Sequence, residues 1–141
     1  MTSPMALPDH HKPVTWQSTM LATLAFICAI CLLRLPFRAT IATIEILHRL
    51  PLTTPTTADT TIARLANACA RAGAWWPGRA ACLEISLTLV LAAVFTGRRL
   101  HWCLGGRFDP PATHAWAQTP DGTPVGEGAT TAWPWTTALC I

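Results

Sequence analysis

Residues 77–87 read PGRAACLEISL, and they open the segment on which the predicted fold of this chain depends. From Arg79 to about Thr96 the apolar side chains recur at helical spacing, and Gly97 ends the pattern. This helix would carry Cys82 in or near its first turn. The free backbone N–H groups and the positive dipole of a helix start favour an anion, and therefore a thiolate. The segment predicts an apolar helix with a candidate nucleophile at its N-terminal end, although a buried structural cysteine is the alternative.

Three short strands are predicted after this helix. Residues 100–108 suit a first strand with glycines near its end, and residues 113–118 suit a second strand that carries His114. The sequence Pro-Asp-Gly at 120–122 predicts a turn, after which residues 123–127 return as a third strand. We expect an α+β fold with a papain- or transglutaminase-like core. In that core the cysteine-bearing helix packs on a small antiparallel sheet.

His114 is the candidate general base, and two acids compete to orient its ring. Asp121 precedes a glycine in the turn, where an aspartate ordinarily serves the turn itself. Glu127 faces the same side as His114 if the turn centres on 120–121 or on 121–122. A three-residue loop would direct Glu127 to the other face of the sheet unless a bulge intervenes. We expect Glu127 to be the third catalytic residue and keep Asp121 as the alternative.

The first half of the chain divides into three predicted regions by composition. Residues 1–12 are polar and proline-rich, which predicts a disordered tail. Residues 13–59 form an apolar helical region that ends in a Thr/Pro linker, and residues 60–141 form the protease-like core. The core opens with a helix that we expect Thr57 or Asp59 to cap at its start and Gly73 to end. The boundary between the last two regions is therefore placed at residue 59.

Residues 13–33 contain no charged side chain over 21 positions, which is long enough to span a bilayer. The continuous apolar portion is shorter, from Met20 to Leu33, and its fourteen residues are more typical of a buried helix. A buried or partner-facing helix is therefore favoured. Peripheral membrane association and a targeting segment are the alternatives.

The composition limits the classes of function. Only 12% of the residues are charged, about half the usual share, so the chain buries much of its surface or meets a membrane or a partner protein. The net charge of +3 comes from scattered arginines, which gives no support for nucleic-acid binding. The six cysteines are irregularly spaced and predict free thiols in a reducing cytoplasm rather than a disulfide framework. His101 and Cys103 share one face of a strand, where we expect simple packing, and no metal or cofactor is expected.

These motifs resemble the B2 protein family of lasso peptide biosynthesis, a group of transglutaminase-like cysteine proteases. The resemblance covers roughly residues 60 to 130. It is carried by PGRAACLEISL at 77–87, His-Ala-Trp at 114–116 and Asp-Gly at 121–122, followed by Pro-Val-Gly-Glu at 124–127. It implies a leader peptidase in which Cys82 is the nucleophile and His114 the general base. The family's third residue falls on the returning strand, where many relatives have Asp and this chain has Glu127.

The resemblance also implies three partners. They are a ribosomally made lasso precursor peptide, a separate small leader-binding protein and a cyclase that closes the ring. Some relatives carry the leader-binding part at their N-terminus, but residues 1–59 are too apolar and helical for that small domain. We therefore expect the leader-binding protein to act in trans. The alternatives are a transglutaminase or amidase on the same scaffold, and a non-enzymatic membrane-associated scaffold protein.

Overall fold

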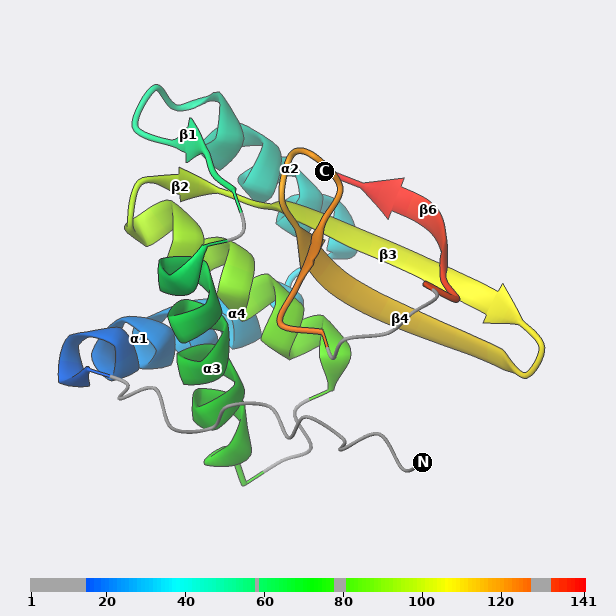
Figure 1. The fold of residues 1–141 in the computed structure, drawn as a ribbon, viewed down its shortest axis with the longest axis horizontal. Helices are drawn as coiled ribbons and strands as arrows, with labels where there is room; N and C mark the ends of the chain where they lie inside the picture. Colours follow the sequence, from blue (N-terminus) through cyan, green and yellow to red (C-terminus); the bar gives the residue numbers. More distant parts are fainter. Residues whose placement is uncertain (1–14, 58, 78–80, 128–132) are drawn as a thin grey trace, which may run out of the picture.

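Four helices and a small sheet make up the part of the chain that the computed structural model describes, which is residues 15–57, 59–77, 81–127 and 133–141 (Figure 1). The predicted tail at 1–12 lies outside these residues, as do positions 78–80, where the cysteine-bearing helix was expected to begin. The helices are α1 (Trp16–Leu33), α2 (Phe37–Arg49), α3 (Thr60–Ala74) and α4 (Cys82–Phe95). The α+β class expected from the sequence is confirmed.

The main sheet has four strands in the order β5-β4-β3-β6, all paired antiparallel. Its strands are β3 (His101–Phe108), β4 (Pro111–Gln118), β5 (Pro124–Val125) and β6 (Thr136–Cys140). The first three were predicted from the sequence, and β6 was not. A separate two-stranded parallel pair joins β1 (Thr54–Pro55) to β2 (Arg98–Arg99).

Helix α4 is the centre of the hydrophobic core. Leu87, Val90, Ala92 and Ala93 on this helix have no exposed surface. They point in different directions because α1, α3 and strand β4 all pack against the same helix. A helix that is apolar on every side needs such an environment. Burying one leucine or valine side chain contributes roughly 1.5–3 kcal/mol, so the helix that carries Cys82 is also a main source of stability.

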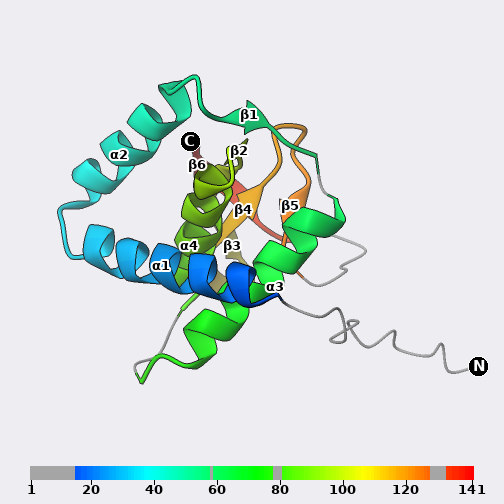
Figure 2. The ribbon, with the colours of Figure 1, turned by 90° about the vertical axis from the view of Figure 1, so that its left-hand side faces the viewer.

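Helix α1 lies across α3 and α4, and α2 follows it at an angle (Figure 2). One face of α1 is buried through Ala22, Ala25 and Ala29. The opposite face exposes large apolar side chains, among them Trp16 (71%) and Met20 (55%). The segment expected to be a buried helix is thus buried on one side only. By length and composition α1 could also cross a membrane, which is weak support for membrane association.

The helices on both sides of residue 59 share one hydrophobic core. Ala25 of α1 and Ile44 of α2 belong to the same buried cluster as Leu65 of α3 and Leu87 of α4. The boundary predicted at residue 59 therefore does not separate two hydrophobic cores.

The ends of α3 differ partly from the prediction. Asp59 is the N-cap, and its carboxylate accepts the N–H of Ile62 at 2.9 Å. The same carboxylate pairs with Arg98 at 3.0 Å, which ties the start of α3 to β2. Gly73 is not the C-cap, because it lies buried in the last turn with a helical backbone and the helix continues to Ala74.

Two of the six cysteines are joined. Cys103 on β3 lies directly opposite Cys140 on β6, and the two form a disulfide. The expectation of six free thiols is wrong for this pair, because the fourth strand was missed and nothing in the sequence brought Cys140 beside Cys103. Cys28, Cys31, Cys69 and Cys82 are free.

Candidate active site

Cys82 is the first residue of α4, so it lies in the first turn as the sequence predicted, although the helix begins at Cys82 and not at Arg79. The preceding residue, Ala81, has no side-chain acceptor with which to cap the helix, and no side-chain cap is formed among the described residues. Instead the carboxylate of Glu84 accepts the backbone N–H of Ala81 at 3.0 Å. The N–H groups of the first turn therefore stay available beside the thiol, and such groups stabilise a developing negative charge.

His114 lies on β4 opposite Gly105 of β3, and its side chain is 18% exposed. Its Nε2 atom lies 3.1 Å from Oε1 of Glu127, whose side chain is 30% exposed. In the neutral tautomer that donates from Nε2 to this carboxylate, the Nδ1 atom keeps its lone pair. The pair thus has the arrangement of a general base held in place by an acid.

The hairpin has the three-residue loop, which was expected to direct Glu127 away from His114 unless a bulge intervened. Thr119 and Thr123 close a three-residue loop, and Ala117 pairs with Val125. Continued regularly, this register would place Glu127 on the face away from His114. Gly126 breaks the strand with a φ of +75°, a left-handed conformation that favours glycine. The break turns Glu127 back toward His114.

Asp121 is occupied within its own turn. Its carboxylate accepts hydrogen bonds from the hydroxyl of Thr119 and from the N–H of Thr123. These hydrogen bonds, the Thr119 hydroxyl first, hold the pKa of Asp121 below its usual value. The structure therefore brings Glu127, and not Asp121, to the ring of His114.

Three tryptophans surround the imidazole. Trp116 stacks on His114 with ring centroids 6.0 Å apart, and Trp135 approaches it to 4.8 Å. Trp133 packs edge-on against Trp116. Burial among aromatic rings limits the orientations of the imidazole. Trp133 and Trp135 were not among the residues predicted from the sequence, and the signal for them was the Trp-Pro-Trp run before β6.

Gly105 makes room for this arrangement. A Cβ atom built on it would collide with the backbone carbonyl of Thr136 and touch the ring of Trp116 at 3.0 Å. Strand β6 can therefore approach β3 closely only because this position has no side chain.

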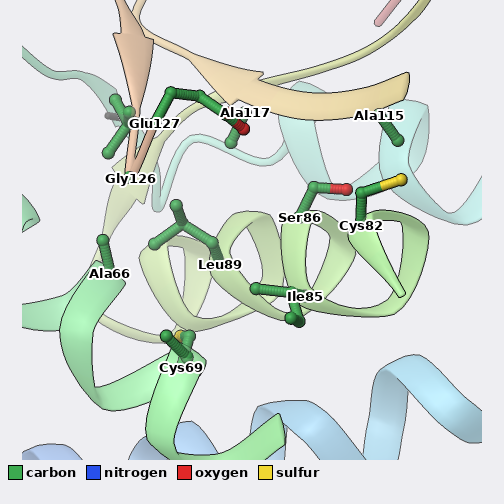
Figure 3. A pocket seen from close by; sticks show the side chains of 12 residues that line it. Ala66, Cys69, Cys82, Ile85, Ser86, Leu89, Ala115, Ala117, Gly126 and Glu127 are labelled. Atoms are coloured by element: carbon green, nitrogen blue, oxygen red, sulfur yellow. The ribbon is translucent and has the colours of Figure 1, made fainter. Parts of the chain in front are cut away.

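Two hollows meet at Cys82. The histidine hollow, about 490 Å³, is lined by Cys82 and His114 together with residues of β3 and β4, among them Leu104, Gly105 and Thr113. The α3–α4 hollow, about 350 Å³, lies between α3, α4 and the β4–β5 hairpin (Figure 3). Its lining includes Ala66, Cys69 and Ala70 from α3, Cys82, Ile85, Ser86 and Leu89 from α4, and Ala115 and Glu127 from the sheet side. Cys82 is thus accessible from two sides.

The remaining sequence candidates lie away from this site. His101 faces His48 of α2, with ring centroids 6.1 Å apart, rather than the hollows. Burial, followed by the charges of His101 and Arg99, lowers the pKa of His48 to about 4. In the described part of the chain no three histidine, cysteine or acidic side chains are grouped as a metal site would require.

A comparison with known protein families gives a match over most of the chain. The model of the Transglutaminase-like superfamily matches residues 25–137, from the middle of α1 to β6. The chain belongs to the transglutaminase-like superfamily. This superfamily includes cysteine proteases and acyltransferases, and its enzymes typically use a cysteine, a histidine and an aspartate. Here Glu127 is the acid beside the histidine. Neither the curated proteins nor the solved structures compared with the chain give a match.

Proposed function

We propose that this protein is a cysteine endopeptidase that removes the leader peptide from a ribosomally synthesised lasso precursor. The observation that carries the proposal is that His114, hydrogen-bonded to Glu127, lines the same hollow as Cys82. The motif resemblance supports the substrate class. A separate leader-binding protein and a cyclase are the proposed partners, and the cytoplasm is the proposed compartment.

In the proposed reaction, Nδ1 of His114 takes the proton of the Cys82 thiol as the sulfur attacks the scissile carbonyl carbon. The negative charge that develops on the carbonyl oxygen lies near the N–H groups at the start of α4. The C–N bond then breaks, and the departing amine takes the proton from His114. A thioester with Cys82 remains.

Water completes the cycle. His114 accepts a proton from water as the hydroxide attacks the thioester, the C–S bond breaks, and the thiol of Cys82 recovers its proton. Glu127 keeps the imidazole oriented and stabilises its protonated form. A transglutaminase or amidase would use the same residues, and the superfamily match supports acyl transfer in general. In a transferase an amine replaces water as the acceptor.

The test is a precursor peptide incubated with the protein and its leader-binding partner, with the products measured by mass spectrometry. We expect cleavage into leader and core, and none with Cys82→Ala. Cys31→Ala is the matched control, because Cys31 is a free, exposed cysteine on α1. Full processing by Cys82→Ala would contradict both enzymatic functions and leave the non-enzymatic scaffold. Adding a primary amine distinguishes the other two, since a transferase would yield the amide in place of the free acid.

A further inference from the structure

The α3–α4 hollow reaches the nucleophile from a side that His114 does not line. We propose that this hollow binds an apolar side chain of the substrate, on the residue that supplies the scissile carbonyl. This assignment rests on the proposed function, because it concerns which acyl group the same cysteine accepts from the substrate.

The direction of the substrate follows from the position of the general acid. His114 must reach the departing nitrogen, so the leaving half of the substrate belongs in the histidine hollow. The acyl half then extends from Cys82 on the other side. The α3–α4 hollow lies on that side of Cys82. Cys82 and Ala115 line both this hollow and the histidine hollow.

The walls of the hollow select for an apolar group. Ala66, Ile85 and Leu89 supply its surface from the two helices (Figure 3). Ala70 of α3 adds to this apolar lining. Cys69 adds an uncharged thiol, because burial raises its pKa to about 12. An apolar surface of this kind gains free energy when it covers an apolar side chain, and it cannot compensate a buried charge.

The polar groups at the hollow are already engaged. Ser86 donates its hydroxyl proton to the carbonyl of Leu83 and accepts the indole N–H of Trp102 at 2.9 Å. Glu127 is paired with His114. A charged substrate side chain would therefore find no free partner of opposite charge among the described residues that line the hollow, and Glu127 would repel an acidic one.

The size of the hollow fits a branched or aromatic side chain. Its volume of about 350 Å³ exceeds the roughly 150 Å³ of an apolar cavity that accommodates benzene. The hollow exists because small residues line it, namely alanines on α3 and β4 together with Gly126. Larger side chains at these positions would fill it. Ala70 is exposed at the rim, so enlarging it narrows the hollow without disturbing the core.

Three amino-acid chloromethyl ketones with identical blocking groups test the proposal, since each alkylates a cysteine next to a bound side chain. They carry leucine, alanine or glutamate, and the rate of modification at Cys82 is followed by peptide mapping. We expect the leucine probe to react at least about tenfold faster than the glutamate probe, the scale of discrimination that apolar pockets reach. Ala70→Phe should remove most of the leucine advantage while leaving the alanine probe unchanged. Ala63→Phe, at an exposed alanine of the same helix outside the hollow, should behave as the unmodified protein.

Equal rates for leucine and glutamate would overturn the proposal, as would an Ala70→Phe variant that slows all three probes alike while its thermal unfolding is unchanged. Failure of the proposed peptidase gives a different result. In that case the leucine preference persists at Cys82 but the precursor peptide is not cleaved. No reaction at Cys82 with any probe would contradict both proposals.

Discussion

Glu127 accepts a hydrogen bond from Nε2 of His114 across 3.1 Å, although the pairing of their hairpin would place them on opposite faces. The left-handed backbone of Gly126, one residue earlier, reconciles the two. The conformation of Gly126 thus determines that Glu127 is the acid that hydrogen-bonds to His114. The local conformation of the backbone has overridden the alternation of side chains along the strand.

Replacing Glu127 with Ala should reduce the rate of substrate cleavage by about 10²-fold or more, the scale of general-base catalysis, because His114 as the base would lose the acid that orients its ring. Asp121→Ala, which alters only the turn, should retain most of the activity. The measurement is kcat/KM on the precursor peptide, and iodoacetamide alkylation of Cys82 serves as an independent readout. A larger loss with Asp121→Ala than with Glu127→Ala, in proteins of equal thermal stability, would assign the third role to Asp121.

Replacing Gly105 with Ala should destabilise the protein by about 1–3 kcal/mol, the usual cost of overpacking. The added methyl group has no space, because it would collide with the backbone carbonyl of Thr136. Gly106→Ala is the matched control, since its Cβ would lie 3.2 Å from the carbonyl of Ala112, a contact that a small shift relieves. Urea denaturation of both variants checks this, and equal stability would show that β6 does not pack on β3 as described.

Acidification should lower stability through His48. Its pKa is about 4 in the folded protein, against an ordinary value of 6.5, chiefly because burial disfavours the charged ring. The unfolded chain therefore binds the proton first, and this stabilising contribution is complete above pH 6.5 and is lost as the pH falls toward 4. Arg99 and His101 face the ring and oppose its protonation, while a hydrogen bond with the backbone of Leu100 favours it.

The measurement for His48 is the urea midpoint at pH 7.5 and at pH 5 for the unmodified protein and for His48→Phe, in which this group cannot titrate. We expect the decrease in the midpoint to be smaller in the variant. The same decrease in both proteins would mean that other groups cause it.

A thiol assay in denaturant should detect four free cysteines before reduction and six after it, because Cys103 and Cys140 are joined. Cys140→Ala should leave five free thiols, since its loss releases Cys103. Six thiols without reductant would show that the pair is reduced in the isolated protein. Disulfides are rare in the reducing cytoplasm, so the result also bears on the proposed compartment.

The sequence predicted the elements with strong local signals. The apolar period from Arg79 to about Thr96, the capping carboxylate of Asp59 and the Asp-Gly turn at 121–122 each indicated a structure that was found, although the helix begins at Cys82. These features depend on residues that are close together along the chain. The position of Cys82 at the start of α4 could be predicted for the same reason.

What the sequence did not predict depends on contacts between distant residues. Strand β6 is held by Gly105, whose missing side chain admits Thr136, and by the disulfide of Cys103 with Cys140. Trp133 and Trp135, which lie beside His114, directly precede this strand, so their position could not be predicted without it. Likewise, the left-handed backbone of Gly126 could not be distinguished in the sequence from an ordinary strand glycine.

The two helices that line the α3–α4 hollow differ in how freely they can change. Helix α4 combines the proposed nucleophile, Cys82, with much of the buried core, so most substitutions on it would affect the reactivity of the thiol and the folding of the chain together. Helix α3 reaches the hollow through Ala66, Cys69 and the exposed Ala70, and bears no catalytic group. New selectivity could therefore be engineered, or acquired in evolution, on α3 alone while the chemistry on α4 is kept.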